Sequence, residues 1–307
     1  MTHHVWDITS NLLQSVTAQD MVFHGENVKE GTAYLVLGDG HGIGKVIESA
    51  RKFNWKQIID VPTANLQTIV QPFINKHSAS DSEADGMTLT IVRIRTDYDS
   101  RGSTLIELAW IGDSLISIGK LGGVYDDPED RLLFHNSDYV IHPSLSGRVT
   151  SEPVRSFQIK NENEVIAKQD YYFHFKNKKN RIEEVINMTG SIGHCGDATH
   201  HLFQKVIDLP KNDKCIIRIA SDGWWNVMHK GDWDTVLNPN VTSKDLSVLA
   251  QERWEKLDWV YYPSLPEEDE VEPILNASLG ESDDISVGTI VLYPKPDDVS
   301  YKPRRAK

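Results

Sequence analysis

Short apolar runs bounded by turn residues predict most of the strands in this chain. Such runs occupy residues 32–38, 214–220 and 285–292. Runs of this length, flanked by glycine, aspartate or proline, are typical of buried strands. The first run is expected to end at Gly38, and residues 25–31 before it form a hairpin connection from a first strand near residues 20–24.

A change in the spacing of the apolar residues marks the other elements. Further strands are predicted over residues 87–95, 103–111 and 115–118, joined by short turns as an antiparallel meander. Helices are predicted over residues 46–53, 63–77 and 243–257, with another beginning at Trp224. Ser243 is a residue type that caps a helix N-terminus. Because two helices precede the meander as a block, the pattern indicates a mixed α+β layout and not a parallel βαβ fold.

Residues 123–180 are polar and hard to assign to elements, which indicates an insertion or flap over the core. The end of this segment holds the basic cluster KNKKNR at residues 176–181. A short charge run is usually a solvated face, and the alternative is docking of an acidic substrate segment. Residues 263–273 form an acidic, proline-flanked loop, and the tail from Pro294 is expected to fray.

The chain of 307 residues is acidic, with a net charge of −13. Non-specific binding to nucleic acid depends on lysine and arginine that neutralise phosphates. The charge therefore argues against a nucleic-acid partner and against an anionic membrane surface. The hydrophobic content of 39% suffices for a globular core. An acidic protein that handles phosphate needs local cations, such as metal ions, to offset its own field.

The two cysteines, Cys195 and Cys215, are expected to be free buried thiols, which suits a reducing compartment. The N-terminus has no basic segment followed by an apolar core, so no signal peptide is predicted. No apolar run approaches the length of a membrane span. These features predict a cytoplasmic protein, with the nucleus as the alternative.

Asp39 and His41 follow the first apolar run on a backbone in which every second residue is glycine. A buried charge must be paired or bind a metal, so a carboxylate and an imidazole at the end of a buried strand indicate a site. The alternative is a tight strand-to-helix turn with solvated polar groups. Phosphate-binding glycine motifs do not fit, because Gly44-Lys45 is followed by Val46 and no glycine set has the dinucleotide spacing.

Aspartates stand beside the ends of several predicted strands: Asp20, Asp39, Asp113, Asp222 and Asp283. Carboxylates that converge repel one another at close range and need cations between them. A set of oxygen donors, without cysteine or clustered histidine, suits Mg²⁺ or Mn²⁺ better than zinc or copper. The alternative is five ordinary turns, since Asp-Gly is a common turn pair.

Several segments, taken in order, resemble the protein phosphatase 2C family of metal-dependent serine/threonine phosphatases. They are LVLGDGHG, ADGMTLTIV, LAWIGDSLISI, MTGSIGHCGD, IRIASDGWW and SDDISVGTIVL. Matches in the correct order along residues 13–293 are far more specific than any one of them alone. On this basis, residues 1–293 are expected to form one domain, followed by a flexible tail over residues 294–307.

The resemblance implies a four-layer αββα sandwich, in which two central antiparallel sheets are flanked by helices. It also implies two Mg²⁺ or Mn²⁺ ions, with a weaker third, that activate a water for attack on phosphoserine or phosphothreonine in protein substrates. His41 would be the general acid, and we expect a monomer. The implied metal ligands are Asp39 as the bridge, Gly40 through its carbonyl, Asp222 and Asp283 on the first ion, Asp20 beside the second and Asp113 on the third.

The phosphate-binding positions depart from the family pattern. The departures are Ser15, Leu115 and Gly190 in place of arginines, Gln19 in place of an acid and Asp284 in place of an asparagine. The arginine missing at Ser15 would grip the substrate phosphate, and Lys45 or Arg51 is an alternative cation for that role. Two function classes remain open: an active phosphatase with altered substrate binding, or a pseudo-phosphatase that acts as a binding or regulatory module.

Overall fold

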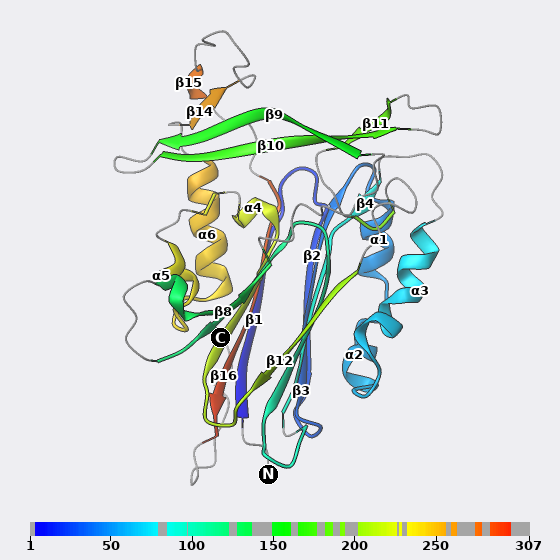
Figure 1. The fold of residues 1–307 in the computed structure, drawn as a ribbon, viewed down its shortest axis with the longest axis vertical. Helices are drawn as coiled ribbons and strands as arrows, with labels where there is room; N and C mark the ends of the chain where they lie inside the picture. Colours follow the sequence, from blue (N-terminus) through cyan, green and yellow to red (C-terminus); the bar gives the residue numbers. More distant parts are fainter. Residues whose placement is uncertain are drawn as a thin grey trace.

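Two antiparallel β-sheets lie face to face at the centre of the molecule, as the computed structural model shows (Figure 1). The structure describes residues 4–78, 85–96, 98–122, 128–136, 149–160, 165–176, 182–186, 191–193, 202–225, 227–228, 232–255, 259–262, 274–277 and 283–295. Sheet A has the strand order β1-β16-β13-β7-β8. Sheet B has the order β12-β6-β5-β3-β2, with β4 paired to β3.

The strands of both sheets come from distant parts of the chain. Those of sheet A are β1 (His4–Leu13), β7 (Leu115–Lys120), β8 (Leu132–His135), β13 (Cys215–Ala220) and β16 (Ile285–Pro294). Those of sheet B are β2 (Asp20–Asn27), β3 (Thr32–His41), β4 (Gly86–Met87), β5 (Leu89–Arg95), β6 (Thr104–Ile111) and β12 (Phe203–Leu209). Each sheet therefore forms only when segments far apart in sequence meet.

Helices cover the outer face of each sheet. Over sheet B lie α1 (Lys45–Arg51), α2 (Gln57–Asp60) and α3 (Leu66–Ser78). Over sheet A lie α4 (Asp222–Trp225), α5 (Trp233–Val236) and α6 (Ser243–Trp254), and a short 3-10 helix, η1 (Pro128–Arg131), precedes β8. This arrangement confirms the expected α+β fold class, a four-layer αββα sandwich.

Alternation along the strands explains the layers, because successive side chains of a strand point to opposite faces. In β3, Leu35 and Leu37 pack between the two sheets, whereas Val36 packs under the helices of sheet B. In β13, Ile217 packs between the sheets, whereas Ile216 packs under the helices of sheet A. These central strands are mostly apolar because both of their faces are covered.

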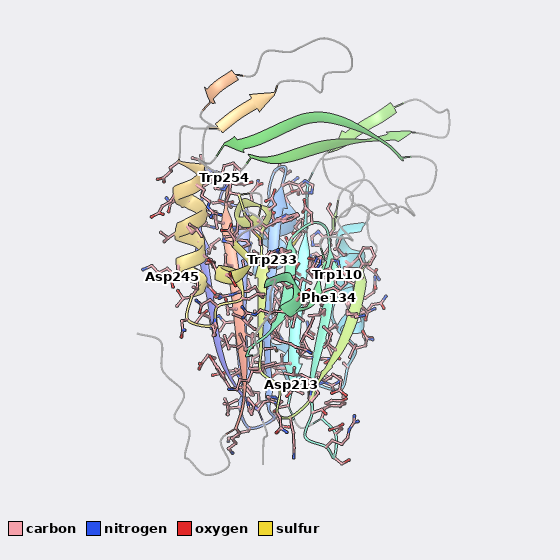
Figure 2. The ribbon with its side chains drawn as sticks, turned by 60° about the vertical axis from the view of Figure 1, so that its left-hand side comes forward. Trp110, Phe134, Asp213, Trp233, Asp245 and Trp254 are labelled. Carbon is pink, nitrogen blue, oxygen red and sulfur yellow. The ribbon has the colours of Figure 1, made fainter. Side chains whose placement is uncertain are left out.

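Aromatic side chains join the two sheets at one edge of the sandwich (Figure 2). The ring of Trp110 on β6 lies 5.7 Å from that of Phe134 on β8 and 5.4 Å from that of Phe203 on β12. Trp110 belongs to the apolar layer between the sheets, against which Phe134 and Phe203 pack. Strand β8 therefore belongs to the sandwich, although it lies inside the polar segment 123–180.

A third sheet lies across one end of the sandwich in Figure 1. Its strands are, in order, β11 (Ile182–Ile186), β10 (Val165–Lys176), β9 (Val149–Lys160), β14 (Trp259–Tyr262) and β15 (Ile274–Ala277). Of the basic cluster at 176–181, residues 177–181 lie outside the described residues, as do the acidic loop at 263–273 and the tail from residue 296. No helix among the described residues is long and apolar enough to cross a membrane.

Three strand predictions were wrong in detail. Strand β1 precedes the predicted first strand and forms the edge of sheet A. The predicted meander is confirmed only for its first two strands, because β5 pairs with β6 whereas β7 pairs with β13 and β8 in the other sheet. Strand β3 does not end at Gly38, because Gly40 and His41 continue the ladder opposite Met87 and Gly86 of β4.

Three helix predictions also need correction. Helix α3 begins at Leu66 and not at Thr63, and the short α2 before it was not predicted. Ser243 is not the cap of α6, because Thr242 has the extended backbone of a cap and accepts the amide hydrogen of Asp245. The Ser243 hydroxyl contacts the Thr289 hydroxyl at 2.8 Å instead. Helix α4 begins at Asp222, two residues before the predicted start at Trp224. The remaining predicted helices and strands are confirmed in type and approximate position.

Candidate metal and phosphate site

Strand register brings acidic residues together at one end of the sandwich. Asp20 and Asp39 stand directly opposite each other on β2 and β3. In sheet A, Ala220 stands opposite Leu115 and Val287, so the chain leaves β13, enters β7 and enters β16 at the same end of that sheet. Just beyond these strand ends lie three more aspartates of the predicted set, namely Asp113, Asp222 and Asp283.

Asp20 is the most deeply buried acid of the group, with 1% of its surface exposed. Burial raises the pKa of Asp20 well above its ordinary value, against the opposing effect of the Ser221 and Ser286 hydroxyls. The negative charges of Asp222 and Asp284 raise it further. Its Oδ2 atom is buried and has no hydrogen-bond partner among the described residues. A buried polar atom without a partner costs free energy, so Asp20 is poorly satisfied by the protein alone.

Asp39 lies at the rim of the same group and keeps part of its surface exposed. The surrounding protein nevertheless removes most of its solvation, which raises the pKa of Asp39 well above its ordinary value. The charges of Asp222, Asp20 and Asp113 raise it further, as does a hydrogen bond with Asp222. A hydrogen bond between two carboxyl groups requires a proton on one of them. The four aspartates therefore lie within electrostatic reach of one another.

Asp283 and Asp284 have different surroundings. The Asp283 carboxylate accepts the amide hydrogen of Asp284 at 2.9 Å. The Asp284 carboxylate, only 3% exposed, accepts amide hydrogens from Ser15, from Gln19 at 2.5 Å and from Asp20 at 3.2 Å. The negative charge of Asp284 also raises the pKa of Asp20. Asp284 therefore fixes the loop that leads into β2, a role that the sequence did not reveal.

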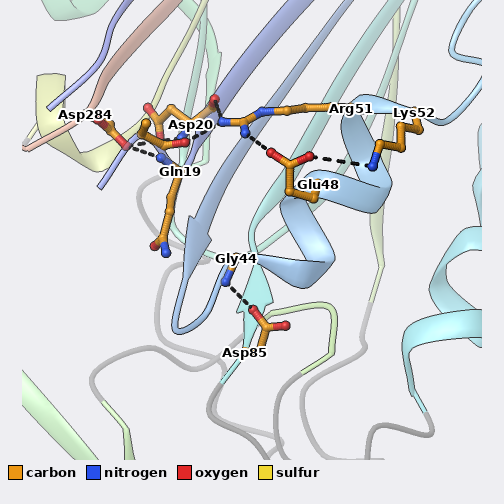
Figure 3. Close-up of polar contacts among 9 residues, drawn as sticks. Gln19, Asp20, Gly44, Glu48, Arg51, Lys52, Asp85 and Asp284 are labelled. Carbon is orange, nitrogen blue, oxygen red and sulfur yellow. Dashed lines mark hydrogen bonds and ion pairs between the residues drawn. The ribbon is translucent and has the colours of Figure 1, made fainter. Parts of the chain in front are cut away.

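Arg51 holds the same loop from the other side (Figure 3). Its guanidinium donates to the backbone carbonyls of Ala18 at 2.5 Å and Asp20 at 2.9 Å, and it also pairs with Glu48. Arg51 was one of the two cations considered for the missing phosphate grip. Because its donors are directed at the protein backbone, it serves as a support for Asp20.

The backbone around Asp39 is fixed by hydroxyl groups. The Thr88 hydroxyl accepts the Asp39 amide hydrogen at 3.2 Å and contacts the Ser114 hydroxyl at 2.8 Å. The Thr88 amide in turn donates to the Asp39 carbonyl at 2.7 Å. Gly40 must be glycine, because a Cβ there would lie 2.7 Å from the Gln19 carbonyl oxygen. Asp39 and Gly40 are therefore held by contacts on both sides of their strand.

The turn after His41 is closed by an aspartate. Gly44 has a φ of +80°, a left-handed conformation that glycine adopts without strain, and it is the first cap residue of α1. Its amide donates to the Asp85 carboxylate at 2.9 Å (Figure 3). The His41 ring lies beside Ser191, with 3.2 Å between Nε2 and the serine Oγ. The His41 ring therefore lies beside Gly86 and Ser191, which come from other parts of the chain.

The end of α6 reaches the same region. The Trp254 indole, labelled in Figure 2, donates to the Gly223 carbonyl at 2.6 Å. A Cβ on Gly223 would lie 2.0 Å from the Asp284 carbonyl oxygen, so the helix start at Asp222 and the entry to β16 are in close contact. Cys215 lies in β13 as a free buried thiol, and burial raises its pKa. Cys195 lies outside the described residues.

The acidic group has the donors of a hard-cation site. Carboxylate and carbonyl oxygens are the ligands that Mg²⁺ and Mn²⁺ prefer, and a cation would relieve both the repulsion among the acids and the unpaired Oδ2 of Asp20. Among the described residues, no three His, Cys, Asp or Glu side chains stand ready as a complete metal site. The residue types therefore fit a divalent cation, whereas the described side chains do not form a complete coordination shell for one.

The chain is similar to solved structures of phosphatases, at low sequence identity. No protein-family model matches the sequence, and no curated protein matches it. Solved structures similar to this chain include the serine/threonine phosphatase of S. agalactiae, at 17% identity and a TM-score of 0.47 over 95% of this chain and 100% of that one. The photosystem II phosphatase PBCP has 14% identity and a TM-score of 0.47 over 95% and 99%. The catalytic domain of the phosphatase PstP, in complex with two manganese ions, has 14% identity and a TM-score of 0.48 over 94% and 99%.

Proposed function

We propose that this protein is a metal-dependent phosphatase that hydrolyses phosphoserine and phosphothreonine in protein substrates. The observation that carries the proposal is the buried acidic group at the rim of the sandwich, in which Asp20 has an unpaired carboxylate oxygen and Asp39 is surrounded by like charges. Groups with strongly perturbed pKa values that converge at one rim are typical of functional sites. The intact DGHG segment, with Asp39 and His41, supports the same reaction.

The ligands would come from both sheets. When bound, Mg²⁺ or Mn²⁺ ions would lower the pKa of a bound water and would stabilise the negative charge of the phosphoryl oxygens. We assign the ligand role to Asp39, Asp222, Asp283, the Gly40 carbonyl, Asp20 and Asp113. Asp284 and Arg51 keep Asp20 in register by holding the loop over residues 15–20.

His41 would act on the leaving group. A serine or threonine alkoxide is a poor leaving group and needs a proton as its bond to phosphorus breaks, which is the task of a general acid. His41 follows Asp39 by two residues and lies on the same strand end. Cys215 has no role in this scheme, since it is buried between the sheets.

Metal dependence is the first test. Turnover of p-nitrophenyl phosphate and of a phosphothreonine peptide should need added Mn²⁺ or Mg²⁺ and should be abolished by chelator. Mn²⁺ binding measured by calorimetry should be lost in Asp222→Asn and retained in Asp208→Asn, a matched change at an exposed aspartate of β12. Full turnover in excess EDTA after dialysis would contradict the proposal.

The pseudo-phosphatase alternative has its own signature. The lack of an arginine at position 15 and the use of Arg51 as a loop support are the observations behind it. In that case Mn²⁺ would bind in the calorimeter with the same dependence on Asp222, but no phosphopeptide would be turned over. Turnover by the wild-type protein that Asp222→Asn abolishes would reject this alternative.

A further inference from the structure

We propose that Ser191 is a positioning residue for His41, an inference that rests on the proposed phosphatase function. Ser191 is 1% exposed, and its Oγ lies 3.2 Å from His41 Nε2. A hydroxyl can both donate and accept a hydrogen bond, so it can hold an imidazole in one orientation and select which ring nitrogen carries the proton. Ser191 is not one of the predicted site residues.

Ser191 is attached to the same framework as the histidine. The next residue, Ile192, exchanges two backbone hydrogen bonds with Met87 of β4, at 3.0 and 2.8 Å. Strand β4 in turn pairs with the end of β3, where Gly86 stands opposite His41. The three short segments therefore form one hydrogen-bonded platform on which the serine and the histidine keep a fixed separation.

Gly86 makes the contact sterically possible. A Cβ at this position would lie 2.6 Å from His41 Nε2, 2.6 Å from Ser191 Oγ and 2.8 Å from the Ile192 carbonyl oxygen. Such distances are shorter than van der Waals contact, so any side chain at position 86 would push the His41 ring and the Ser191 hydroxyl apart. The glycine thus has a specific role beside the ring.

A second anchor lies one residue earlier. Asp85, 3% exposed, accepts the Gly44 amide hydrogen at 2.9 Å and so ties the turn after His41 to the start of β4. The backbone that follows His41 and the hydroxyl beside its ring are therefore both fixed by residues 85–86 and 191–192. This arrangement restricts the ring before any substrate arrives, which is how supporting groups preorganise a catalytic side chain.

The test compares Ser191→Ala with Ser191→Thr, which keeps the hydroxyl, and with Ser247→Ala. Ser247 is a matched control, because its hydroxyl is fully buried in α6 and donates to the Ser243 carbonyl away from the site. A hydrogen bond of ordinary strength predicts that Ser191→Ala lowers kcat on a phosphothreonine peptide about three- to tenfold with little change in KM. Turnover of p-nitrophenyl phosphate, whose leaving group needs no proton, should change less.

A spectroscopic measurement separates this inference from the proposed activity. The ¹⁵N and ¹H signals of the His41 ring, assigned with His41→Ala and recorded near pH 8 where an ordinary imidazole is neutral, report the ring tautomer. Ser191→Ala should change these signals, whereas Ser191→Thr and Ser247→Ala should not. This reading holds even if the wild-type protein shows no turnover, in which case only the proposed function fails.

Two results would overturn the inference. One is a Ser191→Ala protein whose His41 ring signals match those of the wild type. The other is a Ser191→Ala protein that loses turnover equally on the peptide and on the aryl phosphate, with the same loss in Ser247→Ala. That result would mean that the loss of a buried hydroxyl lowers turnover only by lowering stability. Recovery of both kcat and the ring signals in Ser191→Thr is the result that supports it. Gly86→Ala should reproduce the Ser191→Ala signals, because its Cβ would separate the two groups.

Discussion

Two kinds of buried charge occur in this sandwich, and their surroundings are opposite. Arg218 on β13 and Arg93 on β5 each point from a central strand into the helical layer outside it. Arg218 is 2% exposed and donates to the carbonyls of Val236, Asn238 and Val241 at 2.6–3.0 Å. At the rim, Asp20 is buried to a similar degree, with 1% of its surface exposed, but its neighbours include other acids.

The arginines are satisfied, whereas Asp20 is not. Arg93 is 1% exposed, pairs with Glu107 at 2.7 and 2.8 Å and donates to the Ala64 carbonyl at 2.7 Å. Burial lowers the pKa of Arg218 only to about 10, so it stays charged at neutral pH. At Asp20, by contrast, one oxygen has no partner and neighbouring charges add to the cost of ionisation. A protein keeps such a conflict at places that bind something, which distinguishes the rim from the structural arginines.

The largest expected effect is on turnover. Asp39→Asn should lower phosphatase turnover by several orders of magnitude, because a neutral ligand weakens the metal and the acidity of its water. The melting temperature of the metal-free protein should stay equal or rise, because one repelling charge is removed. Enzyme assays and thermal melts of the same preparation check both parts.

Arg218→Met should show the reverse pattern. Loss of the guanidinium leaves several buried carbonyls unpaired, and each such group costs about 1–3 kcal/mol, so we expect a loss of about 3 kcal/mol or more in the free energy of unfolding. Turnover per folded molecule should remain close to that of the wild type. A stable Arg218→Met protein with reduced turnover would remove the distinction between the two centres.

The sequence predicted the fold where local pattern decides it. The apolar runs of β3, β13 and β16 are buried on both faces and were recognised as strands. Strand β1, HVWDITSNLL, was missed because an edge strand mixes polar and apolar residues. The sequence around Gly112 could not predict that β7 crosses into the other sheet. The turn residues there are equally compatible with a hairpin within one sheet and with a connection between two sheets.

The sequence predicted the residues of the acidic group but not the contacts that support it. Aspartates beside strand ends predicted the acidic group, and the structure brings Asp20, Asp39, Asp113 and Asp222 within electrostatic reach. Asp284 was seen only as a departure from a pattern. Its grip on the amides of the loop over residues 15–20 depends on the stacking of two sheets. The contact of Ser191 with His41 likewise joins residues 150 positions apart, so no local pattern indicates it.

The metal-free protein should lose stability as the pH rises. Asp20 and Asp39 have folded-state pKa values raised above the ordinary 3.8, so the folded state binds their protons more tightly than the unfolded state does. Their ionisation penalty is absent below about pH 4 and grows as the pH passes through the raised values. Each pKa unit of the shift corresponds to about 1.4 kcal/mol.

Thermal melts in chelator from about pH 5 to about pH 8 check this expectation. The melting temperature of Asp39→Asn relative to the wild type should increase with pH, and added Mn²⁺ should remove the pH dependence in the wild type. Parallel curves for the two proteins across this range would show that the acids are not under strain, and the contrast with the satisfied arginines would then fail.

The smallest expected effect concerns the phosphate grip at Ser15. Its amide donates to Asp284 and its hydroxyl contacts that of Thr17 at 2.9 Å, so position 15 lies at the edge of the acidic group without a cation of its own. Arg forms a bidentate, charge-assisted contact with phosphate that Ser cannot copy. Ser15→Arg should therefore lower KM for small phosphomonoesters and raise kcat/KM about tenfold, since charged hydrogen bonds contribute about 1.5–3 kcal/mol.

Arg51→Ala and Lys45→Ala test the alternative grips. Because Arg51 donates to the carbonyls of Ala18 and Asp20, its loss should lower the melting temperature and disturb metal binding along with KM. A rise in KM alone, with stability and metal affinity unchanged, would instead make Arg51 the phosphate ligand. The same result in Lys45→Ala would assign that role to Lys45. If none of the three substitutions changes KM, phosphate does not bind beside the loop over residues 15–20, and the acidic group must receive it from another side.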